Sequence, residues 1–182
     1  MFKPLTLAYS LEKKILLDAP IEKVWLTYRD SLPKLVSVMP TVDEIKVVSR
    51  EETKEEVRLL NKWKISGGLP SIIKNLVPIK LLSYNDVAVW NQKDYVCYFT
   101  ETPIDGSEIY KCVGKNTFLE QGNKTLLIIS FELIIHPEKI PGVPSFIAKS
   151  IAPKIEKIIS KEVVKNLAST SKAVEKHISK HY

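Results

Sequence analysis

Residues 15–25 read ILLDAPIEKVW, and this stretch decides how the chain begins to fold. The alternation of apolar and polar residues that leads into it predicts a strand over residues 8–17. Pro20 follows and fits the first turn of a helix, because its missing N–H removes no hydrogen bond there. The apolar residues after Pro20 recur at helical spacing, which predicts a short helix with one buried side over residues 19–30.

The rest of the chain predicts one more short helix or turn, six further strands and a long helix. Residues 31–40 form the second short helix or turn, which Pro40 ends. The six strands are expected at residues 43–52, 55–65, 80–90, 95–102, 108–120 and 125–135. Residues 137–144 contain three prolines and break the pattern, and one helix is expected from Pro144 to Ile178.

These elements predict an α+β protein with a curved antiparallel sheet. Most strands are separated by hairpin-length connections, which favours antiparallel pairing of about six or seven strands. The long C-terminal helix has an apolar stripe that must be buried against another element. The sheet is the one predicted element large enough to cover it. A twisted sheet of this size curls. We therefore expect the sheet to wrap around the helix, with the two short helices following the first strand.

The composition is that of an ordinary globular protein. The chain has 182 residues, of which 45% are hydrophobic and 26% are charged, and this predicts a single domain over residues 1–182. Cys97 and Cys112 lack metal-type or redox-type spacing, so a reducing compartment is expected. The N-terminal residues do not resemble a signal peptide. The longest apolar run, residues 125–135, is too short to span a bilayer. We therefore expect a cytoplasmic protein.

The excess of positive charge lies at the C-terminal end. The net charge is +6, and residues 146–182 contain eight lysines and three glutamates. This excess predicts either a solvated helix face or transient contact with an anionic membrane surface, where each lysine contributes about 1 kcal/mol. Nucleic-acid binding is not expected, because no aromatic residue lies between Phe146 and Tyr182 to stack on bases.

The order of elements resembles the helix-grip fold of the START-like (SRPBCC) superfamily, which includes polyketide cyclases and lipid-transfer proteins. ILLDAPIEKVW (15–25) resembles the first strand and first helix of that superfamily, and PTVDEIKVVSREE (40–52) resembles its second strand. Residues 57–100 are similar in layout to the PRELI-like phospholipid-transfer proteins, which is a weaker resemblance.

The resemblance implies a cavity between the sheet and the C-terminal helix that holds a hydrophobic small molecule or a lipid, and it implies a protein that binds or transfers that ligand. Ligand sites are mostly apolar with a few polar groups. We expect Asn61 and Tyr84 to supply such groups. The full predicted ligand-binding set is Val57, Leu59, Asn61, Trp63, Tyr84, Trp90, Phe99, Leu127, Ile129, Phe131, Leu133, Ile151 and Ile155.

The stretch SGGLPSIIKNLVPI (66–79) is apolar although glycines and prolines mark it as a connection. Apolar residues at near-helical spacing predict a short amphipathic helix between Pro70 and Pro78. It would act as a lid over the cavity mouth, as a membrane-touching tip, or as a plug for one end of the core. The predicted gate residues are Gly67, Gly68, Leu69, Ile72, Ile73 and Leu76.

Catalytic chemistry has little support in the sequence. No Ser/His/Asp or Cys/His constellation is visible, no residues have metal-ligand spacing, and no cofactor is expected. His136, His177 and His181 are expected at the surface. A binding protein is therefore favoured over an enzyme. The alternative is a cyclase/aromatase-like or hydrolase-like enzyme that uses the same cavity, with Asn61, Tyr84, Asp86 and Tyr98 as the residues to test.

A third possibility is a partner-binding module that uses the basic helix. The sequence leaves the identity of the ligand and the oligomeric state open.

Overall fold

The computed structural model describes residues 7–65, 83–142 and 144–181, with side chains for all of them except residue 7 and most of residues 145–162. The predicted gate at residues 66–79 lies outside the described residues. The side chains of Ile151 and Ile155 also lie outside them.

Seven strands form one antiparallel sheet. They are β1 (Leu7–Leu17), β2 (Val42–Glu52), β3 (Glu56–Ile65), β4 (Ser83–Asn91), β5 (Val96–Pro103), β6 (Tyr110–Gln121) and β7 (Lys124–Ile135). Their order in the sheet is β1-β7-β6-β5-β4-β3-β2, so the first strand pairs with the last. The predicted class, an α+β fold with about six or seven antiparallel strands, is confirmed.

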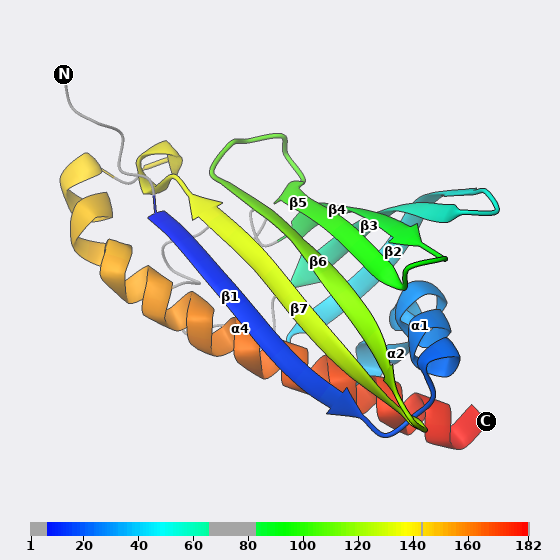
Figure 1. Cartoon of the computed structure of the whole chain (residues 1–182). Coiled ribbons are helices and arrows are strands. Elements are labelled where there is room, and N and C mark those ends of the chain that lie inside the picture. Colours follow the sequence, from blue (N-terminus) through cyan, green and yellow to red (C-terminus); the bar gives the residue numbers. More distant parts are fainter. Residues whose placement is uncertain (1–6, 66–82, 143, 182) are drawn as a thin grey trace.

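Helices lie at one end of the sheet and along its concave side. They are α1 (Ile21–Asp30), α2 (Leu32–Leu35), the 3-10 turns η1 (Val36–Val38) and η3 (Pro137–Lys139), and α4 (Ser145–His181). Figure 1 shows the sheet curving over α4, with α1 and α2 near the C-terminal half of that helix. This is the predicted helix-grip arrangement. In the described part of the chain, no helix is both long enough and apolar enough to cross a membrane.

The core beneath α1 is aromatic. The ring of Trp25 on α1 packs edge-on against Trp90, with centroids 4.9 Å apart, and against Phe118, with centroids 5.2 Å apart. All three side chains are buried. Edge-to-face pairs of this kind add to the stabilisation that burial of apolar surface provides. The apolar side of α1 that the sequence predicts therefore fixes this helix to the inner face of the sheet.

Hydrogen bonds fix the C-terminal half of α4 to the N-terminal part of the chain. The hydroxyl of Tyr28 lies 3.0 Å from that of Ser171, and both side chains are buried. The hydroxyl of Thr41 also donates to the side-chain oxygen of Asn166. Because both bonds join segments far apart in the sequence, they set the position of α4 relative to α1 and β2.

Gly114 on β6 lies where two phenylalanines meet on the inner face of the sheet. It pairs with Phe99 on β5 and with Phe131 on β7. A Cβ atom at Gly114 would lie 2.6 Å from Phe99 Cζ and 2.6 Å from Phe131 Cβ, which is closer than real contacts allow. The absence of a side chain here therefore lets both rings pack on the inner face of the sheet, where each borders the cavity described next.

Candidate functional site

A cavity of about 280 Å³ lies between the inner face of the sheet and α4. Strands β3 to β7 supply most of its wall, and Val163, Asn166, Leu167 and Thr170 of α4 close the other side. Its wall is mainly apolar, as is usual for sites that bind small ligands. Of the predicted ligand-binding residues, those that line it are Trp63, Tyr84, Trp90, Phe99, Ile129, Phe131 and Leu133.

Four other predicted residues do not border the cavity. Val57, Leu59 and Leu127 are at most 3% exposed and belong to the hydrophobic core. Asn61 is also buried, and it acts on the cavity through its neighbour Asp86. The period-two pattern of the strands gave the correct inner face for these residues, but it could not separate solid core from cavity wall.

A row of polar side chains crosses the cavity wall on four adjacent strands. Asn61 lies opposite Asp86, Asp86 lies opposite Glu101, and Glu101 lies opposite Cys112. The amide of Asn61 donates to Asp86 Oδ2 at 3.1 Å, and the indole N–H of Trp63 donates to the same oxygen at 3.3 Å. Directly paired residues on one face of a sheet are close enough to interact, so these groups act together.

The two acids in this row have altered pKa values. Burial raises the pKa of Asp86 to about 6, although the hydrogen bonds from Asn61 and Trp63 oppose this shift. Burial also raises the pKa of Glu101 to about 8; the charge of Asp86 raises it further, while a hydrogen bond from Cys112 opposes the shift. One acid is therefore largely ionised at neutral pH and its neighbour largely protonated. Such a pair can hold a proton or bind a polar group of a ligand.

Aromatic rings flank the acids. Trp63 and Tyr84 stack with their ring centroids 5.8 Å apart and their planes 8° apart, and both border the cavity. Burial raises the pKa of Tyr84, and the nearby charges of Glu101 and Asp86 raise it further. This hydroxyl is therefore neutral at every physiological pH and serves as a hydrogen-bonding group.

Burial likewise raises the pKa values of the thiols of Cys97 and Cys112. Both cysteines are buried, and neither forms a disulfide. Their reactivity is low for the same reason, because the thiolate is the nucleophile.

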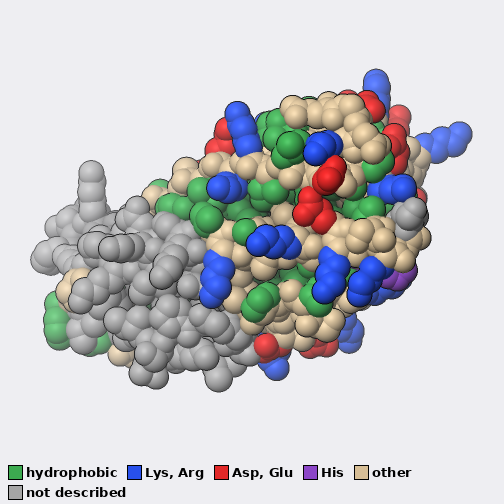
Figure 2. Space-filling model, turned by 90° about the horizontal axis from the view of Figure 1, so that it is seen from below, with side chains coloured by type: hydrophobic (Ala, Val, Ile, Leu, Met, Phe, Trp, Pro, Cys, Tyr) green, Lys and Arg blue, Asp and Glu red, His purple; other side chains and the backbone are tan. Residues whose placement is uncertain are grey.

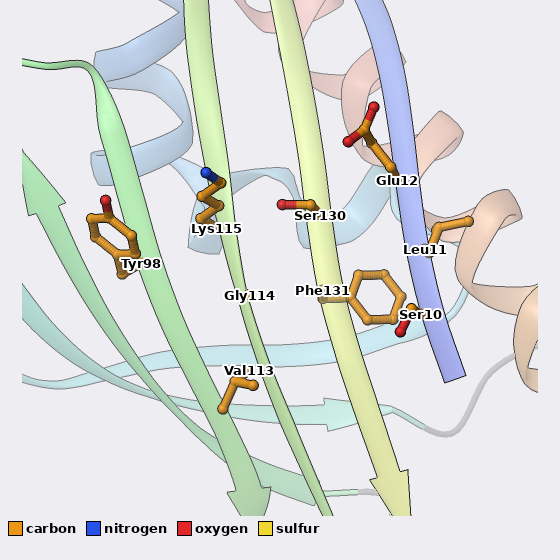
Figure 3. A pocket seen from close by; sticks show the side chains of 9 residues that line it. All are labelled: Ser10, Leu11, Glu12, Tyr98, Val113, Gly114, Lys115, Ser130 and Phe131. Atoms are coloured by element: carbon orange, nitrogen blue, oxygen red, sulfur yellow. The ribbon is translucent and has the colours of Figure 1, made fainter. Parts of the chain in front are cut away.

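Tyr98 lies on the opposite face of the sheet, which corrects its place among the candidate catalytic residues. Its neighbours Cys97 and Phe99 border the cavity, so the alternation of the strand turns Tyr98 outward, where it is 54% exposed. Figure 3 shows it beside a broad, open depression of about 480 Å³ around Gly114, lined by residues of β1, β5, β6 and β7. The cavity on the inner face is the better ligand site, because it lies between the sheet and α4 and is more enclosed than this depression.

The sequence prediction missed Glu101, Cys112 and Asn116 as cavity-wall residues. A signal for Glu101 was present, because it lies two residues after Phe99 and so shares its inward face. However, the apolar residues of the strand at residues 95–102 lie mainly near its start. A carboxylate near the end of a strand is usually interpreted as facing solvent, so Glu101 was not predicted as a cavity residue. Only the antiparallel pairing with Asp86 brings it into the cavity.

No group of three or more His, Cys, Asp or Glu residues able to hold a metal ion is present within residues 7–65, 83–142 and 144–181. Two of the three histidines lie together near the end of α4, where the rings of His177 and His181 stack with centroids 4.2 Å apart. His177, His181 and His136 all lie outside the cavity wall. The polar groups of the described cavity wall are carboxyl, amide, hydroxyl, indole and thiol groups.

Comparison by sequence finds no protein-family profile and no curated protein that matches the chain. Comparison of structures finds many matches. A Thermus thermophilus protein, TTHA0849, is 17% identical with a TM-score of 0.66, covering 93% of this chain and 97% of its own. The Zhui aromatase/cyclase from a Streptomyces species is 10% identical with a TM-score of 0.63, covering 94% of each chain.

A START superfamily protein from Mycobacterium smegmatis is 13% identical with a TM-score of 0.54, and the match covers 95% of this chain and 99% of that one. Identities this low show a shared fold and leave activity open. The matches cover at least 93% of this chain, so the similarity extends over the sheet, the short helices after β1 and the long C-terminal helix. The chain has the helix-grip fold, and it shares this fold with a START superfamily protein.

Proposed function

We propose that this protein binds a hydrophobic small molecule or lipid in the cavity between the sheet and α4. The observation that carries the proposal is the partly enclosed, mainly apolar space of about 280 Å³ bounded by aromatic and aliphatic side chains. This volume lies just below the range of about 300–1,000 Å³ typical of ligand sites, which favours a compact ligand. The structural similarity to START-like proteins supports the same reading.

Native mass spectrometry of the purified protein, followed by solvent extraction, tests this proposal. We expect an excess mass that organic solvent removes, together with methyl NMR shifts at Ile129 and Leu167 when the ligand returns. Both residues border the cavity from opposite sides, Ile129 on β7 and Leu167 on α4. A protein that carries no extractable molecule, and whose cavity methyls respond to no apolar compound, would refute it.

Transfer of the ligand between membranes is a further part of the proposal. Lys172, Lys176 and Lys180 are exposed in the C-terminal half of α4. On the face of the molecule that includes α4, Lys and Arg side chains lie beside hydrophobic ones in the described part of the chain (Figure 2). Such a surface suits transient contact with anionic lipid headgroups. We also propose that the protein is cytoplasmic and that residues 1–182 form a single domain.

A second candidate is an enzyme of the cyclase/aromatase or hydrolase type. The observation that favours it is the pair Asp86 and Glu101, because a carboxyl group with a pKa near neutrality can act as a general acid or base. The similarity to the Zhui aromatase/cyclase points in the same direction. Turnover of a cavity-bound compound that is lost in Asp86→Asn and in Glu101→Gln, while binding of that compound is retained, would favour the enzyme over the binding protein.

A further inference from the structure

The described part of the cavity wall carries two acids and no bases. Asp86 and Glu101 lie directly opposite each other on β4 and β5, and both border the cavity. None of the described residues that line the cavity is Lys, Arg or His. Charged groups taken out of water are unfavourable unless they are paired. The described wall residues therefore supply negative charge here without supplying a positive group to pair with it.

Both carboxyl groups retain unused hydrogen-bonding capacity. The two donors to Asp86, from Asn61 and Trp63, both reach the same oxygen, Oδ2. The partner of Glu101 is the thiol of Cys112, which is a weak donor. An ionised carboxylate offers about four acceptor positions, so Asp86 Oδ1 and the Glu101 carboxyl can accept further bonds from a molecule in the cavity.

Two other polar atoms on the cavity wall point independently to a ligand with polar groups. Trp90 Nε1 and Asn116 Oδ1 are buried and have no hydrogen-bond partner among the described residues. Trp90 is only 5% exposed, and both residues border the cavity. Trp90 pairs with Cys97, and Cys97 pairs with Asn116, so these residues form one row across three strands. This row lies about 13 Å along the strands from the row that contains Asp86 and Glu101. Buried polar atoms are nearly always hydrogen-bonded, so the wall has unmet polar capacity at both ends.

We propose that the cavity takes an apolar ligand with one basic nitrogen, and that Asp86 and Glu101 together bind this nitrogen. The inference rests on the proposed function and specifies the ligand's polar group. A protonated amine supplies the missing positive charge and donates up to three hydrogen bonds. The stacked rings of Trp63 and Tyr84 border the same cavity and favour a cation over a neutral group.

The titration of the acids supplies a second readout. Glu101, with a pKa of about 8, is largely protonated at neutral pH in the free protein. A bound cation lowers the pKa values of both acids, so binding releases protons. The titratable groups that act on Glu101 and its neighbours are Asp86 and Tyr84 from β4 and Tyr110 and Cys112 from β6. On α4 the described wall residues, Val163, Asn166, Leu167 and Thr170, do not titrate.

Three probes that share a phenylalkyl body and differ at one end test the proposal: phenylbutylamine, phenylbutanol and phenylbutyrate. Isothermal titration calorimetry at neutral pH, in buffers of different ionisation enthalpy, gives affinity and proton release together. We expect the amine to bind about tenfold more tightly than the alcohol, because its hydrogen bonds are charge-assisted. We expect the carboxylate to bind most weakly, and only the amine to release protons.

Variants assign the effect to the two acids. Glu101→Gln and Asp86→Asn should each remove most of the amine's advantage and leave binding of phenylbutanol in place. Glu132→Gln is the matched control, because Glu132 is an exposed carboxylate on β7 of the same sheet and does not border the cavity. If Asp86→Asn fails to fold, Glu101→Gln together with the loss of proton release decides the question.

Equal binding of the amine and the alcohol to the unaltered protein would overturn this inference and leave the proposed function standing. An amine preference that survives in Glu101→Gln and Asp86→Asn would overturn it as well. If none of the three probes binds and the purified protein yields no extractable molecule, the proposed function itself falls.

Discussion

The amide of Asn61 on β3 donates a hydrogen bond to the carboxylate of Asp86 on β4, with Nδ2 3.1 Å from Oδ2. The two residues lie directly opposite each other in the sheet, and both are buried. This bond is one of two that oppose the effect of burial on the acid. It therefore links the stability of the sheet to the charge in the cavity.

Asn61→Leu should raise the pKa of Asp86 above its value of about 6 and reduce the free energy of unfolding by about 1–3 kcal/mol. The reason is that the carboxylate loses a donor that it cannot replace from water. Carbon NMR of the Asp86 carboxyl gives the pKa, and urea unfolding gives the stability. Asn85→Leu is the control, since Asn85 is the neighbouring amide on the other face of β4. An unchanged titration of Asp86 would show that the bond does not support its charge.

Glu101→Gln should change how stability depends on pH. The pKa of Glu101 is raised to about 8 in the folded protein, so the folded state keeps a proton that the unfolded chain releases at lower pH. The resulting stabilisation is complete below the unfolded pKa and is lost as the pH rises through about 8. Between about pH 5 and pH 9 the unaltered protein should therefore lose about 2–4 kcal/mol more stability than the variant does.

Urea unfolding of both proteins across that range measures the difference, because contributions from groups that do not interact with Glu101 cancel. Parallel pH profiles for the two proteins would contradict the raised pKa of Glu101.

Gly114→Ala should destabilise the protein by about 1–3 kcal/mol, because the added methyl group collides with neighbours that are already packed. A Cβ at this position would lie 2.6 Å from Phe99 Cζ and from Phe131 Cβ. Thermal unfolding measures the loss. In a Phe99→Leu background the same substitution should cost less, since one of the colliding atoms is gone, and additive effects would rule out this contact as the cause.

Tyr28→Phe and Ser171→Ala should each cost about 1 kcal/mol, the usual net value of one hydrogen bond. The hydroxyls lie 3.0 Å apart, and Ser171 Oγ also donates to the carbonyl of Leu167 at 2.9 Å. Because the bond joins α1 to α4, its loss should raise amide exchange in residues 163–181 more than in the sheet. A double-mutant cycle should show coupling between the two sites, and independent effects would show that the bond contributes nothing.

Lys172→Glu combined with Lys176→Glu should weaken binding to vesicles that contain phosphatidylserine, because each lysine near such a surface contributes about 1 kcal/mol. Cosedimentation with the vesicles at low salt measures this binding. Lys46→Glu combined with Lys62→Glu is a control with the same charge change on β2 and β3, away from α4. An equal loss in both double variants would mean that only net charge matters, and that α4 makes no specific contact.

Much of the fold could be predicted because its signals are local. The alternation in residues 55–65 and the helical spacing after Pro20 each occupy one segment and each has one physical cause. Hairpin-length connections predict four of the pairings, β2 with β3 and β4 to β7 in succession, whereas the pairing of β1 with β7 joins the two ends of the chain. The structure accordingly confirms the strands, the short helices after β1 and the long C-terminal helix.

The site was predicted less completely because its chemistry is not local. Glu101 becomes a cavity residue only when β5 pairs with β4 and α4 covers both. Tyr98 was wrongly placed among the candidate site residues because its chemistry suits a ligand site. Side chains alternate along a strand, however, so Tyr98 lies on the opposite face from its neighbour Phe99. Val57 and Leu59 show a third limit, because alternation identifies the inner face without indicating where on that face space remains.

The pairing of β1 with β7 controls the order in which the molecule can assemble. Leu7 lies opposite Ile135 and Leu17 lies opposite Thr125, so the first strand finds its neighbour only after the last one has been made. At ribosomal rates this interval lasts about 5 to 20 s, and contacts this distant in sequence form slowly. Throughout that interval one strand edge is open to other chains. During co-translational folding, the sheet is therefore complete only when β7 pairs with the N-terminal strand β1.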